Sequence, residues 1–359
     1  MKKRTAILIL TLITIFCFVP MSASAAKSNV IRVSNQKEFE EAIARVNKDS
    51  DSEYTIELTA DFSVSGFSLN SSRKATILGN GHTLTMGGGG SVSVSKGAEL
   101  TLGAADGNVL NIRSAEGTNN DAPGMLNIEG TCNMYSGVTL SGREGNNYFG
   151  GGVTVSGGTF HMYGGTIEKC GIKGDSVCYG GGVLAVALKS PAAASIENTT
   201  VKGNKAAVGA GIASYESWTN LSIKGCTVTE NTAQKYGGGF SVESNTGGGK
   251  TTITDTVLCN NIADTAGSDV YLKKSPLVLP STPSMNSIYL GAPEDVRNQK
   301  IDGWYEDKTD SRYTEQEKAA RKEYTGGMGT HLFIIVGAAL MAAAAIALVR
   351  NSKNSNKVK

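Results

Sequence analysis

The chain has 359 residues, of which 40% are hydrophobic and 18% charged, and it contains 45 glycines but only 7 prolines. This is enough apolar material for a packed core, so the composition excludes wholesale disorder, and the lack of a three-residue glycine period excludes collagen. The formal net charge of +2 arises from basic residues near both ends, and residues 26–330 carry about −5. This excludes a nucleic-acid-binding protein, which needs a basic surface.

The first 25 residues have the layout of a secretory signal peptide. A basic start (KKR) precedes an apolar run, and three small residues follow at 23–25. The pattern predicts cleavage between Ala25 and Ala26, which removes residues 1–25 on export. A retained membrane anchor is the alternative.

The stretch QKEFEEAIARVN, residues 36–47, predicts one amphipathic helix. Its apolar positions recur at helical spacing: Phe39, Ala42, Ile43 and Val46. Asn35 is suited to cap the first turn, with Glu38 three residues on. We expect this helix to cover the first strands of the structure that follows, because exposed strand edges invite pairing with other chains.

Short runs rich in Val, Ile, Leu and Thr follow from Tyr54 onwards and predict strands, and after residue 150 they become a regular repeat. A glycine cluster recurs there and is followed by an apolar residue, with a weaker fifth occurrence in which Ser268 and Asp269 follow Gly267. These apolar residues are 30, 29, 28 and 30 positions apart: Val153, Val183, Ile212, Phe240 and Val270. A period of this size predicts a stacked repeat architecture.

A second landmark lies inside each unit, where two apolar residues stand four or five positions apart. These pairs are Met162 and Ile167, Ile196 and Val201, Ile223 and Val228, and Ile253 and Val257. Three residues after the second member stand Cys170, Asn204, Asn231 and Asn260. We expect the asparagines to stack at a corner, where side-chain amides can satisfy a bent backbone.

Two architectures compete for repeats made only of strands. Propeller blades need 40 residues or more, whereas one coil of a parallel β-helix fits the spacing near 30. The sequence therefore predicts an all-β parallel β-helix, or solenoid, over residues 26–272, with about eight coils and an apolar ladder inside.

Two stretches interrupt the repeat and predict outward loops, residues 184–194 and residues 215–220 (YESWTN). Loops on a rigid scaffold are natural binding sites. Trp218 and Tyr215 are the candidate ligand contacts, because aromatic rings stack well on sugars, although packing under their own loop is the alternative. Tyr135, Tyr148, Tyr163 and Tyr236 are expected to lie near corners and to add to such a face.

The C-terminal part changes character at residue 273. Four prolines and then a dense run of charges predict a C-terminal cap around Trp304 and Tyr305, followed by a polar stalk, over residues 273–330. Residues 331–350 contain eighteen consecutive uncharged apolar residues and predict one transmembrane helix. The basic residues that follow predict a cytoplasmic tail over 351–359.

Two resemblances rest on these residues. The stretches ATILGNGHTLTM, VKGNKAAVGAGI and VTENTAQKYGGGF resemble right-handed parallel β-helix proteins of the pectin-lyase-like type, including polymorphic outer-membrane-type adhesins. This implies display at a cell surface. The stretch YTGGMGTHLF with its apolar run and basic tail resembles a Gram-positive cell-wall sorting signal, in which Thr325 and Gly326 match. Transpeptidase cleavage after Thr325 and retention as a single-pass anchor are the alternatives.

Five cysteines remain after the signal peptide, and no CxxC spacing occurs among them. Small buried residues are the expected state, and a disulfide between Cys170 and Cys178 is the alternative. Only His82 and His161 lie outside the membrane-proximal part, so we expect no metal site and no cofactor.

No set of residues predicts catalysis, so no catalytic residue is assigned. The enzymatic alternative is a polysaccharide lyase or glycoside hydrolase, which the resembled fold also hosts and which needs carboxylates across a bond or beside a cation. Acidic residues of the repeats do not fall in one column: Glu168, Glu197, Glu230 and Asp255. The leading hypothesis is therefore an anchored binding, adhesion or structural module whose partner is a glycan or a host or cell-surface protein.

Overall fold

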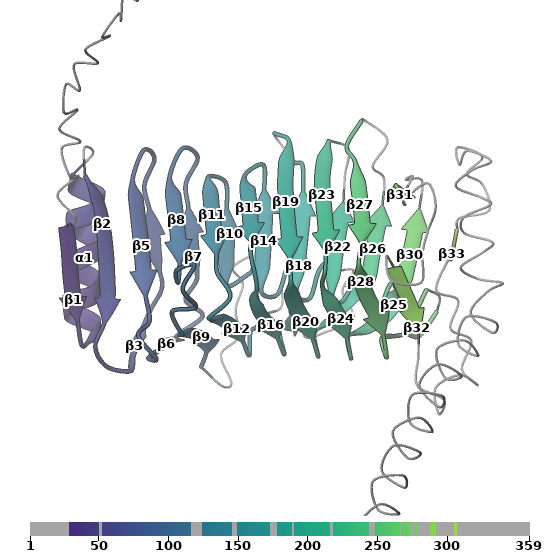
Figure 1. Ribbon diagram of the computed structural model, residues 1–359, viewed down its shortest axis with the longest axis horizontal. Coiled ribbons are helices and arrows are strands. Elements are labelled where there is room, and N and C mark those ends of the chain that lie inside the picture. Colours follow the sequence, from purple (N-terminus) through teal and green to yellow (C-terminus); the bar gives the residue numbers. More distant parts are fainter. Residues whose placement is uncertain are drawn as a thin grey trace, which may run out of the picture.

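The structure is a computed structural model. It describes residues 29–49, 52–115, 124–145, 149–172, 178–188, 190–215, 218–243, 248–265 and 267–273, and the short strands at 277–278, 288–291 and 305–306. Parallel strands wind into a rod of stacked coils, which progress from the N-terminal to the C-terminal end in Figure 1. The predicted all-β parallel solenoid is confirmed.

Each coil contributes one strand to each of three long parallel sheets, which we call sheets A, B and C. Sheet A contains β1 (Asn29–Val33), β2 (Glu53–Leu58), β5 (Lys74–Leu78), β8 (Glu99–Leu102), β11 (Thr131–Met134), β15 (Thr159–Met162), β19 (Ala192–Glu197), β23 (Thr219–Lys224), β27 (Thr251–Thr254) and β31 (Leu277–Val278). Sheet B contains β3 (Phe62–Val64), β6 (Thr83–Met86), β9 (Leu110–Ser114), β12 (Val138–Ser141), β16 (Gly165–Glu168), β20 (Thr199–Lys202), β24 (Thr227–Thr229), β28 (Thr256–Cys259) and β32 (Ile288–Gly291).

Sheet C lies between sheets B and A in chain order. It contains β4 (Phe67–Leu69), β7 (Val92–Val94), β10 (Leu126–Ile128), β14 (Val153–Ser156), β18 (Val183–Val186), β22 (Ile212–Tyr215), β26 (Phe240–Glu243), β30 (Val270–Lys273) and β33 (Tyr305–Glu306). A shorter sheet D enters only in the later coils, between sheets B and C. It contains β13 (Glu144–Gly145), β17 (Gly171–Ile172), β21 (Lys205–Val208), β25 (Thr232–Tyr236) and β29 (Ile262–Ala263).

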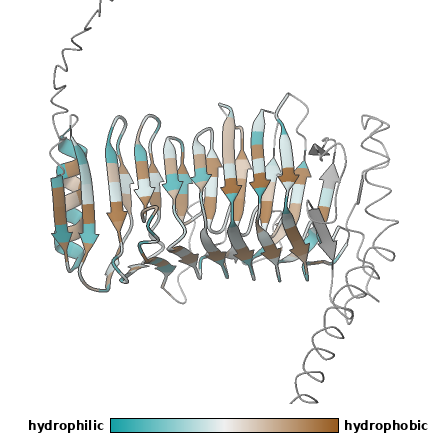
Figure 2. Ribbon diagram, viewed as in Figure 1, coloured by the Kyte–Doolittle hydropathy of each residue, from teal (hydrophilic) through white to brown (hydrophobic). Residues whose placement is uncertain are grey.

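The inward apolar ladder of sheet C has the predicted register. Val153 pairs with Val183, Val183 with Ile212, Ile212 with Phe240, and Phe240 with Val270. All five side chains are fully buried. Hydrophobic and hydrophilic residues alternate along strands of sheet A in Figure 2, and burial alternates with them, as along β2 and β8. The repeat of about 30 residues is therefore the circumference of one coil.

The second ladder is correct except in the last coil. Ile167, Val201 and Val228 follow one another on the inner face of sheet B, but the next member is Leu258 and the corner amide after it is Asn261. The prediction of Val257 and Asn260 was wrong by one residue, and the exposed side chain of Val257 points outward. Leu258 stands five residues after Ile253, so the true pair keeps the spacing of the earlier coils.

The glycine clusters form the sharp bends that lead into sheet C. The first glycine of each cluster has a positive φ, as at Gly180 (69°) and Gly209 (62°), a conformation that side chains with a Cβ resist. Behind these bends, the outward residues Leu184, Val186 and Ala213 of sheet C are buried beside Phe149 and Tyr179. The stretch 184–194 is thus not one outward loop, because Leu184 belongs to β18 and Ala192 begins β19.

The helix α1 (Gln36–Lys48) confirms the predicted amphipathic segment. Asn35 caps it by accepting a hydrogen bond from the main-chain N–H of Glu38, at 3.0 Å. Its predicted apolar positions are buried in the main core, and Phe39 contacts the rings of Phe62 and Phe67 at centroid distances of 5.8 and 5.2 Å. The helix lies at the N-terminal end of the rod beside β1 and β2 (Figure 1).

The five cysteines of the described chain are free thiols, so the alternative of a Cys170–Cys178 disulfide is wrong. Cys170 belongs to the main core, whereas Cys178 belongs to a separate cluster beside sheet D. Burial raises the pKa of the Cys132 and Cys170 thiols to about 12. Such thiols are almost entirely protonated at neutral pH and are therefore unreactive, because the thiolate is the nucleophilic form.

Beyond Leu272, β31, β32 and β33 add one further strand to sheets A, B and C. Tyr305, which was assigned to a C-terminal cap, lies in β33 and pairs with Tyr271 of β30. The signal peptide, the remainder of the stalk, the residues Thr325 and Gly326, the span 331–350 and the tail 351–359 lie outside the described residues. Within the described ranges, no helix has both the length and the apolar character needed to cross a membrane.

Candidate functional site

The outer faces of sheets A and B are the surfaces on which a site would have to be built, because the inner faces are packed. Glu168 lies on sheet B and Glu197 at the end of sheet A, so these two carboxylates belong to different faces. Glu230 and Asp255 lie at corners, with φ angles of +58° and +49°. The structure therefore does not bring the four acidic residues together.

Three carboxylates on the strands are paired with lysines of neighbouring coils. Glu168 contacts Lys202 at 3.2 Å, and Lys74 lies between Glu53 and Glu99 at 3.2 and 3.3 Å. The hydrogen bonds that Lys74 donates to Glu53 and Glu99 raise the pKa of Lys74. These pairs run along the rod axis and neutralise one another, as solvated surface pairs do.

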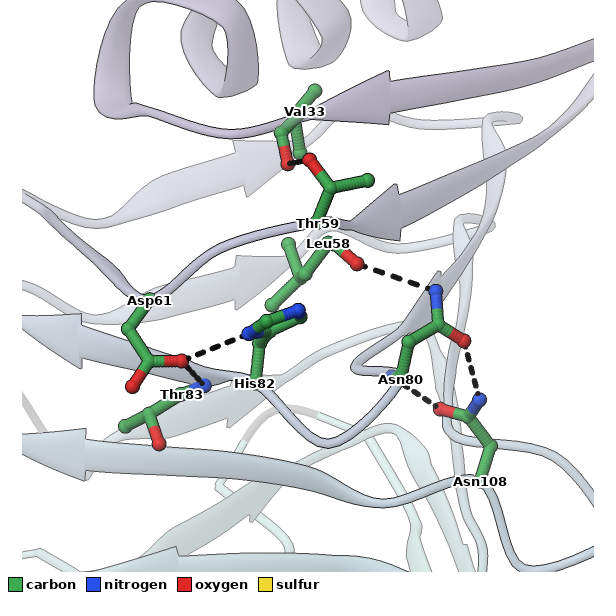
Figure 3. A network of polar contacts seen from close by, with 8 residues as sticks. All are labelled: Val33, Leu58, Thr59, Asp61, Asn80, His82, Thr83 and Asn108. Carbon is green, nitrogen blue, oxygen red and sulfur yellow. Dashed lines mark hydrogen bonds and ion pairs between the residues drawn. The ribbon is translucent and has the colours of Figure 1, made fainter.

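The one histidine–carboxylate pair of the described chain lies in the first coils (Figure 3). His82 Nδ1 is 3.1 Å from Asp61 Oδ1, which also accepts the main-chain N–H of Thr83 at 3.0 Å. The bond from Thr83, followed by that from His82, lowers the pKa of Asp61. His161 lies on sheet A in a later coil, so the two histidines do not meet.

A short ladder of polar side chains lies beside this pair in Figure 3 and has a structural role. Asn80 donates to the carbonyl of Leu58 at 3.2 Å and accepts from the side chain of Asn108 at 2.9 Å. Asn108 in turn accepts the main-chain N–H of Gly79 at 2.8 Å, and Thr59 donates to the carbonyl of Val33 at 3.1 Å. These bonds fix the bends between sheets A and B and leave few free groups for chemistry.

The outer face of sheet B carries a column of hydroxyl groups along the rod. Strand register aligns one outward residue per coil: Thr83, Asn111, Thr139, Thr166, Thr200, Thr227 and Val257. Neighbouring members are about 4.8 Å apart, the spacing of paired strands. We call Thr139, Thr166, Thr200 and Thr227 the threonine column.

The middle column of sheet A is also polar but chemically mixed. Its members are Thr55, Thr76, Thr101, Asn133, His161, Ser195, Ser222 and Thr252. The pairs of Lys74 with Glu53 and Glu99 flank its first part, whereas the Glu168–Lys202 pair lies on sheet B beside Thr166 and Thr200. Sheet B thus offers the more uniform uncharged row of the two faces.

Most of the candidate aromatic side chains stack on one another along the rod. Tyr135 stacks with Tyr163 and Tyr236 with Tyr271, at centroid distances of 5.2 and 4.5 Å. Tyr215 stacks with Tyr179 at 4.4 Å, which uses one face of its ring. Stacking of this kind stabilises adjacent coils and removes ring faces from contact with a ligand. Tyr148 lies outside the described residues.

Trp218 differs from these tyrosines. It is 59% exposed, directly precedes β23 and has a φ of +72°. Its ring lies near Gly248 of the next coil, where a Cβ would be only 3.5 Å away. The described chain therefore leaves much of the indole accessible. The stretch 215–220 is not one outward loop, because Tyr215 ends β22 and Thr219 begins β23.

Comparison with known proteins gives one match. Residues 30–164 match the family model described as “Putative pectate lyase-like adhesive domain”. This half of the rod is similar to pectate lyase-like adhesive domains. Together with the parallel solenoid, the match confirms the resemblance to pectin-lyase-like adhesins. No curated protein and no solved structure matches the chain.

The pectate lyase-like segment contains the His82–Asp61 pair and a shallow recess of about 340 Å³. The recess is lined mainly by serine and glycine residues around Gly66 and Gly90, where an added Cβ would collide with the facing backbone. The threonine column begins in this segment and continues beyond it. The position of the recess, the paired lysines and the hydroxyl rows could not be read from the sequence, because strand register decides which residues share a column.

Proposed function

We propose that the chain is an adhesion module that holds a neutral glycan along the outer face of sheet B. The match of residues 30–164 to an adhesive domain is the observation that carries the proposal. A rigid solenoid suits this role, since its outer columns are fixed before the partner arrives and binding costs little conformational entropy.

The threonine column is the proposed contact surface. Its hydroxyl groups can both donate and accept hydrogen bonds, as sugar hydroxyl groups do. A column without net charge favours an uncharged polymer, and its regular spacing suits a chain that repeats along the rod. Trp218 lies at the corner between sheets C and A, away from the threonine column, and is proposed as a separate aromatic contact, because an exposed indole stacks on a sugar ring. Tyr215 is the weaker candidate of the two, since Tyr179 covers one face of its ring.

The test uses the full-length chain in detergent, applied to a panel of neutral and acidic glycans, with retention and cleavage both scored. We expect retention of a neutral glycan without cleavage. The variant with Thr166→Val and Thr200→Val keeps side-chain shape and removes two hydroxyl groups, so it should weaken binding about tenfold.

The matched control carries Thr76→Val and Thr101→Val on sheet A and should bind as the unaltered chain does. Cleavage of any glycan would instead support the lyase or glycosidase alternative. Equal weakening by both variants would contradict the assignment to sheet B, and failure to retain any glycan would favour a protein partner.

We further propose that the rod is displayed at a cell surface. The signal-like residues 1–25, cleavage between Ala25 and Ala26, and an anchor over 331–350 support this location. N-terminal sequencing of the exported chain should begin at Ala26. Release of the chain by cleavage after Thr325, before Gly326, would identify a wall linkage, and retention in membranes would identify a single-pass anchor.

The helix α1 is the proposed cap of the rod. Its buried apolar face and the contacts of Phe39 with Phe62 and Phe67 support this role, since an uncovered end coil would expose core residues and strand edges. Replacement Phe39→Ala should promote concentration-dependent association of rods, which light scattering can measure.

A further inference from the structure

One position in the glycine clusters changes identity at the entry to β30. The residue before each inward apolar residue of sheet C is Gly152, Gly182, Gly211, Gly239 and finally Asp269. A Cβ at Gly182, Gly211 or Gly239 would lie 3.0, 3.0 or 2.7 Å from a corner asparagine amide nitrogen. A main-chain carbonyl oxygen of the next coil lies nearer still at Gly182 and Gly211, at 2.5 and 2.3 Å, so the neighbouring backbone and the corner asparagine together leave no room for a Cβ at these positions.

The corner asparagines form a continuous ladder of hydrogen bonds. Asn204 donates from its side chain to the side-chain oxygen of Asn231 at 2.9 Å, and Asn231 donates to that of Asn261 at 2.9 Å. Each amide also donates to a main-chain carbonyl of the preceding coil, as Asn231 does to Val201 at 3.0 Å. All three side chains are fully or almost fully buried.

The ladder ends on a carboxyl group. Asn261 donates to Oδ1 of Asp269 at 2.9 Å, so this oxygen takes the place that an asparagine oxygen occupies in the earlier coils. The side chain of Asp269 is only 1% exposed, and its Oδ2 has no hydrogen-bond partner in the described chain. A buried oxygen of this kind is costly when the group is ionised and much less so when it is protonated.

No cation among the described residues compensates the carboxyl group. The thiol of Cys259, on the adjacent strand β28, interacts electrostatically with the carboxyl group of Asp269. The carboxylate of Glu230 interacts with the same thiol. Both neighbours are neutral or negative. Burial raises the pKa of Asp269 from 3.8 to about 7, against the opposing effect of the hydrogen bonds from Asn261.

We propose that Asp269 is a pH-sensitive latch that ends the amide ladder and holds β30 on β26 when it is protonated. Ionisation places an unpaired charge in the closed corner and loosens this end of the rod. The folded coil binds one more proton than the opened coil between pH of about 4 and about 7. Its stability therefore falls as pH rises through that window and is level above it.

Hydrogen exchange of the full-length chain at several pH values tests the proposal, after correction for the intrinsic pH dependence of exchange. Amides of β30 should open about tenfold or more often at pH 7.5 than at pH 5, while those of β14 should not change. Asp269→Asn keeps an acceptor for Asn261 and cannot ionise, so it should abolish this dependence. The exposed residue Asp264 supplies the control, and Asp264→Asn should retain the dependence of the unaltered chain.

Equal pH dependence in the unaltered chain and the Asp269→Asn variant would overturn the proposal. Should that variant fail to fold, Asp269→Gly restores the residue of the earlier coils and should also be insensitive to pH. Carbon NMR of the aspartate carboxyl groups gives a second readout. A group that titrates near pH 7 and vanishes in Asp269→Gly supports the latch, whereas titration of Asp269 near pH 4 contradicts it.

Discussion

The early and the late coils of the rod satisfy the polar groups of their corners in different ways. Up to β12 the chain passes from sheet B directly to sheet C, and its polar ladder lies at the corner between sheets A and B, around Asn80. From β13 onwards sheet D is inserted, and the polar ladder moves to the corner between sheets B and D, around Asn231. A parallel solenoid can therefore change its cross-section part-way, provided that each new corner satisfies its buried backbone groups.

Arg143 lies at the step between the two regions. It is almost fully buried and donates from its guanidinium to the carbonyl of Gly90 at 2.8 Å, while its own carbonyl accepts the N–H of Gly171 at 2.6 Å. Burial lowers the pKa of Arg143 to about 10. The side chain thus links an early glycine corner to the first pair of strands in sheet D.

The largest difference between the regions should appear on loss of one ladder amide. Replacement Asn231→Ala leaves buried partners unsatisfied in two neighbouring coils and should lower the free energy of unfolding by about 4 kcal/mol. Asn80→Gly retains the left-handed backbone at an exposed corner and should cost about 1 kcal/mol. Urea denaturation followed by tryptophan fluorescence measures both, and equal losses would remove the contrast between the regions.

An intermediate effect is expected at the step. Arg143→Met fills a similar volume but leaves the carbonyl of Gly90 without this donor, which should cost about 2 kcal/mol. Hydrogen exchange should show the loss in β13 and β17 rather than in β5 or β8. Uniform loss of protection along the rod would mean that Arg143 is not a local link.

The smallest effect concerns the thiols and leaves stability unchanged. Cys259 is only half-buried, whereas Cys132 is fully buried and has a pKa raised to about 12. An aromatic disulfide reagent should therefore label Cys259 in the folded chain and reach Cys132 only after unfolding. The variant Cys259→Ser should lose the fast phase of labelling. Labelling of Cys132 as fast as that of Cys259 would contradict the packing of the early coils.

The sequence alone was sufficient where the repeat is strict. The column from Val153 to Val270 was predicted because one apolar residue follows every glycine cluster at nearly constant spacing. In β28 the inward residue was predicted wrongly, because Val257 and Leu258 are both apolar. The alternation along a strand cannot show which of two adjacent apolar residues points inward. Trp218 is exposed as expected, but the predicted loop of 215–220 was too long, because strands β22 and β23 include Tyr215 and Thr219.

Other features had no periodic pattern to reveal them. Sheet D is made of short stretches such as Lys205–Val208, which lie between an asparagine and a glycine cluster and were not predicted as strands. Arg143 is a single charged residue, and burial of such a residue is the exception. The sequence shows that Asp269 interrupts its glycine cluster. Its role depends on its contact with Asn261, and the prediction had placed the corner amide one residue earlier, at Asn260.

The strict register also makes whole coils interchangeable. Ile212 of β22 and Phe240 of β26 occupy equivalent places, as do Asn204 and Asn231, so excision of residues 212–239 would rejoin both ladders without a mismatch. Duplication of the same block would lengthen the rod by one turn. A protein built in this manner can change its length through simple genetic gain or loss of one module, while the neighbouring surfaces remain unaltered.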